Sequence, residues 1–200
     1  MAGIGLYGVY YSKATLNSDG VLQSYGGVQT MGKAISATFE PVDTNSNPLY
    51  ANNGIAEKDA AGGAGGTLNL TLDRLKADAV ENLFGLTAAT SVVSGVTGNG
   101  FDFSGNELSA PVGVAFVKWS QEDNNREHYQ AVIFSYVLFS PPSENYQTMG
   151  ESVEWQTPEL SGIVSGGAVT GSLPWKKVYE FPDQASAIQF ITNYFAAPSP

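Results

Sequence analysis

The chain carries one histidine, His128, set in the sequence EHYQAV at the start of an apolar run. Catalysis by a histidine base needs a nucleophile beside the ring and a third group that orients it. The sequence offers no cysteine and no second histidine to build such a constellation. A hydrogen-bonded or exposed histidine on a β-strand is therefore the favoured interpretation of His128.

Three other patterns could carry chemistry, and each fits a plainer role. Glu151 and Glu154, with Glu159 beyond them, would suit a glycosidase pair, but strand residues an odd number apart point to opposite faces. The glycines of 62–66 lack the Lys-Ser/Thr of a phosphate loop and lead into a strand pattern. Asp19 with Gly20 predicts a turn, because no further spaced acids complete a calcium loop. We therefore predict no catalytic, cofactor-binding or metal site and no enzymatic activity.

Composition narrows the class of protein. The chain has 200 residues, nine basic against nineteen acidic, a net charge of −10 and no cysteine. This balance argues against a nucleic-acid binder, which would neutralise phosphates with clustered Lys and Arg. Only 14% of residues are charged and 12% are aromatic. Both figures fit a surface covered by neighbouring proteins, and equally an ordinary β-protein with large aromatic side chains. No signal peptide or membrane anchor is predicted.

Alternating patterns predict mostly strands. Lys33–Val42 places Ile35, Ala37 and Phe39 on one face, and Thr67–Asp73 places its three leucines on one face. Val112–Gly162 holds two long β-type runs, a Pro-Pro break and a third run. We expect a mainly β fold, a β-sandwich or partly open barrel with one or two flanking helices, in a single domain spanning 1–200.

Two helices and two irregular segments complete the expected organisation. One helix is predicted over Arg74–Phe84, with Asp73 as N-cap and Gly85 at its end. A C-terminal helix is expected over 184–195, opened by Pro182-Asp183. A long polar loop, 43–66, should project from the sheet, and about residues 1–12 should form an ordered N-terminal strand or arm. Residues 91–110 hold only a weak strand pattern at 91–96.

The order of features resembles the major tail proteins, or tail tube proteins, of long-tailed bacteriophages, particularly the phi13-type group. The similarity is carried by GLYGVYYS, MGKAISATFEPVDTNSNPLYANNGIAEKD, GGTLNLTLDRLKADAVENLFGLT, PVGVAFVKW, HYQAVIFSYVLFSPPSENYQTMGESVEWQTPELSG and WKKVYEFPDQASAIQFI. It covers nearly the whole chain except Ser91–Ala110. The Gly-rich GGAGG before Thr67 and the long Gly/Ser insert depart from the family's loop lengths.

The resemblance implies a sandwich-like subunit with a flanking helix. Six copies form a ring, the rings stack into a hollow tube, and genomic DNA passes through the channel without specific binding. It further implies a place in the virion after assembly in the bacterial cytoplasm. The implied partners are other copies of the chain and the tail terminator, tape measure and distal tail proteins. Two alternatives remain open: a tube subunit of a tailocin or secretion machine, and a monomeric β-sandwich binding module.

Residues for the three expected surfaces follow from alternation and local composition. Polar side chains opposite the apolar strand faces are candidates for lining the lumen, with Val153 and Trp155 setting the core face of a third strand. These candidates are Ser36, Thr38, Glu40, Asn69, Thr71, Asp73, Ser152, Glu154 and Gln156. Candidates for contact between rings are Pro48, Leu49, Tyr50 and Ile55. Candidates for packing of the N-terminal segment are Leu6, Tyr7, Val9, Tyr10 and Tyr11.

Overall fold

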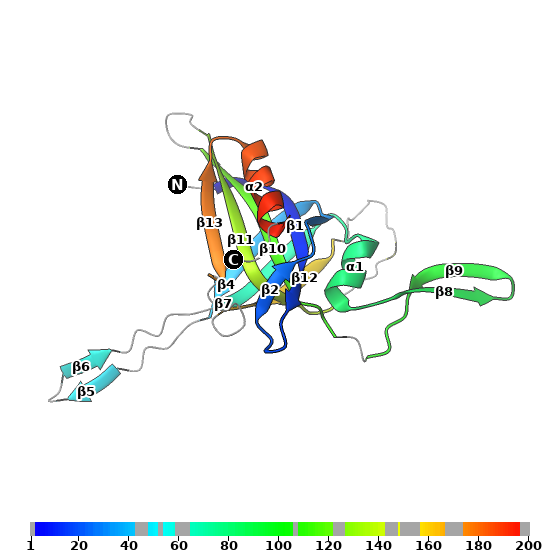
Figure 1. The fold of residues 1–200 in the computed structure, drawn as a ribbon, viewed down its shortest axis with the longest axis horizontal. Helices are drawn as coiled ribbons and strands as arrows, with labels where there is room; N and C mark the ends of the chain where they lie inside the picture. The colour runs from blue at the N-terminus through cyan, green and yellow to red at the C-terminus, as the bar shows by residue number, and fades with distance from the viewer. Residues whose placement is uncertain are drawn as a thin grey trace.

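The long apolar runs near the middle of the chain form an antiparallel hairpin of β10 (Val112–Gln121) and β11 (Glu127–Phe139). β1 (Gly3–Leu16) pairs with β10, and β13 (Lys176–Phe181) pairs with the first half of β11. The computed structural model describes residues 3–42, 48–51, 54–58, 65–105, 108–121, 127–142, 148, 157–166 and 174–196. These four antiparallel strands make the first layer of the fold (Figure 1).

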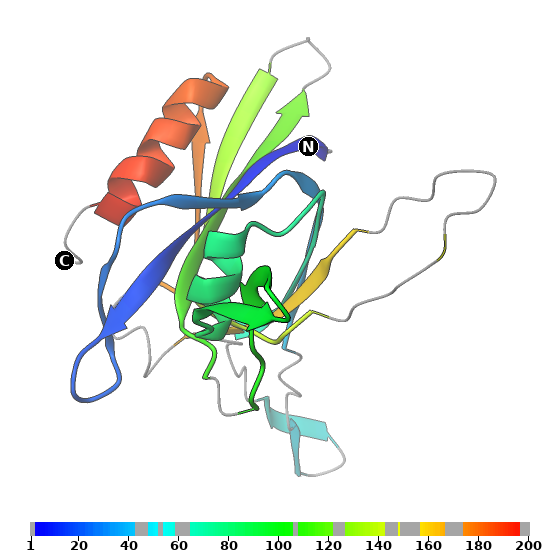
Figure 2. The same cartoon turned by 90° about the vertical axis from the view of Figure 1, so that its right-hand side faces the viewer.

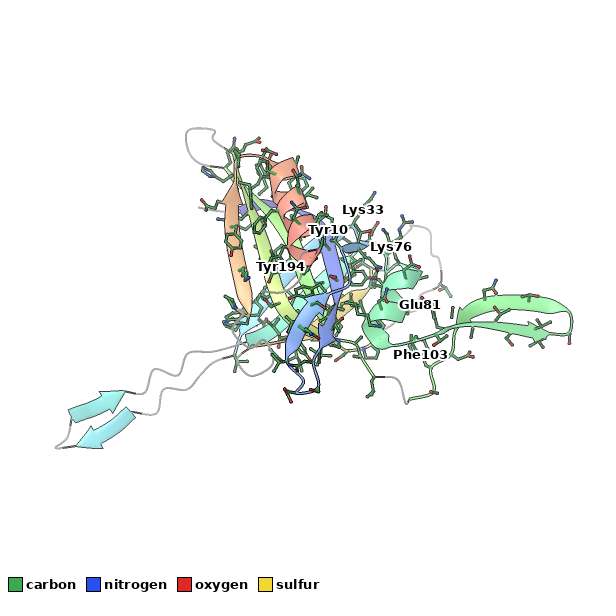
Figure 3. The ribbon with its side chains drawn as sticks, in the orientation of Figure 1. Tyr10, Lys33, Lys76, Glu81, Phe103 and Tyr194 are labelled. Carbon is green, nitrogen blue, oxygen red and sulfur yellow. The ribbon has the colours of Figure 1, made fainter. Side chains whose placement is uncertain are left out.

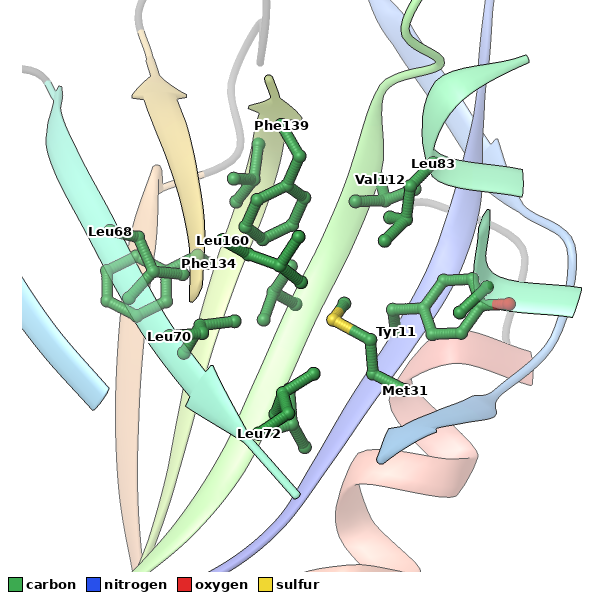
Figure 4. Close-up of a cluster of buried hydrophobic side chains, with 14 of the residues drawn as sticks. Tyr11, Met31, Leu68, Leu70, Leu72, Leu83, Val112, Phe134, Phe139 and Leu160 are labelled. Atoms are coloured by element: carbon green, nitrogen blue, oxygen red, sulfur yellow. The ribbon is translucent and has the colours of Figure 1, made fainter. Parts of the chain in front are cut away.

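A second layer continues from the far end of β11. β12 (Glu159–Ser165) pairs with the last residues of β11, β7 (Gly65–Leu72) pairs with β12, and β4 (Ala34–Pro41) forms the outer edge on β7. The sheet curls back on itself. Two strands, β12 and β7, separate β11 from β4 in the sheet, and yet the rings of Phe39 on β4 and Phe134 on β11 lie only 5.0 Å apart. Leucines of β7 lie near Phe134, Phe139 and Leu160 inside this curl (Figure 4).

The two faces of the β10–β11 hairpin are both buried. Val114, Phe116 and Phe134 belong to the main core between the layers. Ala115, Val117 and Ile133 point the other way and pack on α2 (Gln184–Ala196), which covers this face (Figure 2). Strands buried on both faces read as nearly continuous apolar runs, which explains the sequence of this hairpin.

Helix α2 begins where the Pro182-Asp183 pattern predicts. The Asp183 carboxylate accepts hydrogen bonds from the backbone N–H and the hydroxyl of Ser186, each 2.8 Å long. This is the N-cap geometry that satisfies an otherwise unpaired helix donor. The bond from the Ser186 backbone N–H is the main reason that the pKa of Asp183 is lowered.

Helix α1 is shorter than expected, spanning Ala77–Phe84, and Asp73 is not its N-cap. Lys76 occupies that position without a side-chain cap. The Asp73 carboxylate instead accepts the backbone N–H groups of Lys33 and Arg74, at 2.7 and 2.8 Å. A tie to a distant strand therefore replaces the local cap. The helix does end at Gly85, whose φ of 64° is the left-handed conformation that glycine adopts freely.

Residues 1–12 were expected as an arm or a strand, and the structure describes a strand. Residues 3–16 run along β10 near one end of the sheet, with irregularities between Gly3 and Gly5 and between Tyr7 and Val9. Two short strands, β2 (Leu22–Tyr25) and β3 (Gln29–Gly32), also pair with β1. Of the two expected forms, the segment takes the strand and not the arm, because its backbone pairs with neighbouring strands on both sides.

The strand pattern of Lys33–Val42 also needs one correction. A bulge between Ala34 and Ser36 shifts the register with β7, so Ala34, Ala37 and Phe39 face the core. Ile35 sits in the bulge and is 55% exposed. One extra residue in one strand of a pair changes which side chains share a face, and periodicity alone does not reveal it.

Two small hairpins complete the described part of the chain. β5 (Pro48–Ala51) and β6 (Gly54–Lys58) form a hairpin within the segment 43–66 that was expected as a projecting loop. Strand β7 begins at Gly65, so this segment is two residues shorter than expected. β8 (Ala88–Val93) and β9 (Val96–Phe101) form the other hairpin, which extends from the domain in Figure 1. The expected mainly β fold with two helices is confirmed, and the sheet is open rather than a closed barrel.

Candidate functional site

The outward face of β4, β7 and β12 is polar except at Ile163, which is 61% exposed, and no other described element covers it. Three ranks of side chains cross it, because β7 pairs with both neighbours in register. The ranks are Ser36–Thr71–Glu159, Thr38–Asn69–Ser161 and Glu40–Thr67–Ile163. We call this surface the polar face. The hydroxyl of Ser36 donates to that of Thr71 at 2.9 Å, and the first two ranks line a shallow depression.

The polar face carries negative charge only. Glu40 and Glu159 are exposed on it, and the sequences of the three strands, AISATFEP, GGTLNLTL and ELSGIVS, contain no Lys or Arg. The inward faces of the same strands hold Leu68, Leu70 and Leu160, each at most 1% exposed. A surface with carboxylates and no cations repels phosphates and offers no counterion release to a nucleic acid.

Five of the expected lumen residues therefore lie together on one face: Ser36, Thr38, Glu40, Asn69 and Thr71. Glu159 and Ser161 belong to the same face, and sequence reasoning missed them. The alternation of Leu160 and Val164 with polar residues was the available signal, but the third strand was expected at 152–156. Ser152, Glu154 and Gln156 lie outside the described residues.

Asp73 has a different role from the other acids. It follows β7, and its carboxylate is tied to backbone amides of Lys33 and Arg74 while its own N–H donates to the Lys33 carbonyl at 2.9 Å. These bonds, led by the one from the Lys33 N–H, lower the pKa of the carboxyl. Asp73 thus closes the junction between β7 and the start of β4, at the end of the polar face.

The expected contact residues between rings occupy the β5–β6 hairpin. Pro48, Leu49 and Tyr50 lie in β5, and Ile55 lies in β6 opposite Tyr50. In Figure 1 this hairpin stands away from the sheet, beyond the end where β4 stops and β7 begins. We refer to residues 43–64 as the arm segment.

The N-terminal candidates pack within their own chain. Val9 and Tyr11 are fully buried in the main core, Leu6 packs beside it, and Tyr10 packs on the α2 cluster. The Tyr11 hydroxyl donates to the Gln29 side chain at 2.5 Å and accepts from Asn82 at 3.2 Å. Only Tyr7 is exposed, and its ring lies 6.4 Å from that of Tyr129.

The β8–β9 hairpin is a surface that the sequence did not reveal. Its two-residue turn, Ser94-Gly95, has φ angles of 51° and 82°, as a type I′ hairpin turn requires. Val92 and Val93 point to opposite faces of the strand, yet both are exposed, and Val96 is 73% exposed. An apolar tip open to water on both faces is a candidate contact surface.

The residues considered for chemistry are dispersed. His128 lies in β11 opposite Ser120, whereas Glu159 lies on β12 in the polar face. Glu151 and Glu154 fall outside the described residues. Asp19-Gly20 forms the expected turn, in which the Asn17 side chain accepts the N–H groups of Asp19 and Val21. The described part of the chain holds no group of three acidic or histidine side chains able to bind a metal ion.

Two comparisons bear on identity. Neither protein-family models nor curated proteins give a match to this chain. Among the helices that the structure describes, none is long and apolar enough to span a bilayer.

Proposed function

We propose that this chain is the structural subunit of a bacteriophage tail tube. Copies form hexameric rings that stack, and genomic DNA passes through the central channel during ejection. One observation carries the proposal: a contiguous polar face, free of basic residues, backs onto the main core across three strands. The sequence resemblance to tail tube proteins supports the same assignment.

The chemistry of the polar face suits a channel for DNA. Hydroxyl and amide groups keep the wall hydrated, while Glu40 and Glu159 repel phosphates. Lysines in their place would attach DNA electrostatically and slow its movement. The face is thus suited to passage and not to binding, in agreement with the acidic balance of the whole chain.

The edge of the sheet offers a means of closing a ring. Among the described strands, β4 pairs with β7 alone, so its other edge exposes unpaired backbone groups. Ile35 and Val42, at the two ends of this edge strand, are 55% and 59% exposed. In the proposed ring, β4 pairs with a strand of the next copy. That pairing satisfies the backbone groups, covers the two side chains and continues the polar face around the channel.

The arm segment supplies the contact between rings in this proposal, through Pro48, Leu49, Tyr50 and Ile55. The partners of the assembled tube in this proposal are the tail terminator and distal tail proteins at its ends and the tape measure protein in its lumen. No catalytic step or cofactor enters the mechanism, because the subunit works by positioning its surfaces.

Electron microscopy of the purified protein, combined with light scattering on a sizing column, tests the proposal. We expect six-fold rings or hollow tubes with a central channel. A stable monomer at all concentrations up to the millimolar range would overturn it and favour the monomeric binding module. Tubes from a gene cluster without capsid and terminase genes would favour the tailocin or secretion alternative.

A further inference from the structure

Basic residues are scarce in this chain, and three of the nine meet at one pocket. Lys33, Arg74 and Lys76 line a depression beside Leu6 and Tyr7, where β1, β3 and the start of β4 converge. All three cations are exposed, and the Lys76 ammonium donates to the Thr30 hydroxyl. Figure 3 shows Lys33 and Lys76 close together beside α1. We call this depression the cationic pocket.

The residues that line the cationic pocket include three cations and no acid. Asp73 is the nearest, and two of its hydrogen bonds go to the backbone N–H groups of Lys33 and Arg74. Asp78 and Glu81 follow on α1, and their charges act on the buried Tyr11 behind the helix. A site with exposed ammonium and guanidinium groups and an apolar side suits an acidic segment that also carries apolar residues.

The arm segment has that composition. Its residues include Asp43, Glu57 and Asp59 against Lys58, which gives three negative charges and one positive, a net of −2. Leu49, Tyr50 and Ile55 supply apolar groups within the β5–β6 hairpin. The sign of its charge and its mixed character both complement the cationic pocket.

The position of the two features decides which copy the arm segment reaches. β4 and β7 are antiparallel, and Ala34 lies opposite Leu72 at the end beside the pocket. Pro41 lies opposite Gly66 at the other end, where the arm segment leaves the sheet. Eight residues of strand span about 26 Å, so the two features mark opposite ends of one strand pair. A contact between different surfaces of two copies is heterologous and propagates along a stack.

We propose that the cationic pocket receives the arm segment of a second copy of this chain, in the adjacent ring. The inference rests on the proposed tube function and adds the surface on which its stacking contact forms. Lys33, Arg74 and Lys76 face the acids of the incoming hairpin, while Leu6 and Tyr7 cover part of its apolar side. Because the arm of each copy engages the pocket of the next, stacking has one direction.

Charge reversal on each side of the contact tests this assignment. Lys33→Glu with Lys76→Glu should shorten tubes, measured as mean length by electron microscopy, at least about tenfold, because like charges then meet across the contact. Glu57→Lys with Asp59→Lys should do the same. The four changes together restore opposite charges and should return tubes to near wild-type length. Raising the salt concentration should also shorten wild-type tubes, because salt screens the attraction between the pocket and the arm segment.

The control is Lys13→Glu with Lys177→Glu, an identical charge change on β1 and β13 at residues outside the lining of the pocket. Thermal unfolding of each variant separates loss of stacking from loss of folding. Full-length tubes from the pocket variant, or failure of the four-fold variant to recover while folded, would overturn the inference and leave the tube function standing. Absence of any assembly in the wild type would overturn both.

Discussion

The two layers of this protein differ in how many of their faces are buried. The β10–β11 hairpin has apolar side chains on both faces, one covered by the main core and the other by α2. The layer of β4, β7 and β12 has one apolar face and leaves the polar face bare. The first layer is therefore a scaffold that tolerates little change. The second offers a surface whose residues are free to serve function.

The largest expected effect comes from weakening the packing of α2 on the β10–β11 hairpin. Phe195 on α2 is fully buried, with its ring 4.9 Å from that of Tyr25. Phe195→Ala should lower the free energy of unfolding by about 3–5 kcal/mol, because it leaves a cavity in a packed cluster. Denaturant titration measures the loss. Thr38→Ala on the polar face is the matched truncation and should change it by about 0.5 kcal/mol or less.

A smaller probe adds one methyl group at a packed position of the first layer and at an open position elsewhere in the chain. A Cβ at Gly113 in β10 would lie 2.5 Å from a ring carbon of Phe195 and 2.6 Å from one of Tyr25. Gly113→Ala should therefore destabilise the fold by about 1–3 kcal/mol through overpacking. Gly100→Ala on the β8–β9 hairpin meets no atom within 4 Å and serves as the control. Equal thermal stability of the two variants would refute the tight packing of α2 on β10.

Charge reversal on the polar face should affect function with little cost in stability. Glu40→Lys with Glu159→Lys changes two exposed residues, so we expect the free energy of unfolding to shift by about 0.5 kcal/mol or less. Assembled tubes of this variant should retain short duplex DNA at low salt and release it as salt rises. Asp19→Lys with Glu180→Lys makes the same charge change elsewhere. Equal retention by both variants would argue against the polar face as the channel wall.

The smallest effect concerns acid pH. Hydrogen bonds from backbone amides, led by that of Lys33, lower the pKa of Asp73 below its usual value of 3.8. A carboxyl with a lowered folded-state pKa stabilises the fold above its unfolded pKa, and this contribution disappears as pH falls through the folded value. Below about pH 4 the wild type should lose stability more steeply than Asp73→Asn. Parallel melting curves for the two proteins across pH 2–5 would contradict this assignment.

Much of the fold followed from local pattern. The alternation of Thr67–Asp73 placed the leucines of β7 inward, and Pro182-Asp183 and Gly85 marked helix ends correctly, because these signals act over a few residues. The β8–β9 hairpin was predicted only as a weak strand at 91–96, which spans its turn at Ser94-Gly95, since its Gly/Ser/Thr-rich strands have no clean period. Alternation also predicted that Ser36, Thr38, Glu40, Asn69 and Thr71 lie opposite the apolar strand faces, and they do share one face. Glu159 and Ser161 lie on β12, whereas the sequence predicted the third strand at 152–156.

The sequence by itself determined the character of the chain: it is acidic, poor in charged residues and without cysteine, and several of its strands have one polar face. What the tertiary structure decided was which segments meet. The bulge at Ile35, the tie from Asp73 to Lys33, and the gathering of Lys33, Arg74 and Lys76 at one pocket all join residues distant in sequence. Periodicity reports the burial of each strand separately. Register between strands depends on packing across the whole sheet, so it becomes definite only when the core closes.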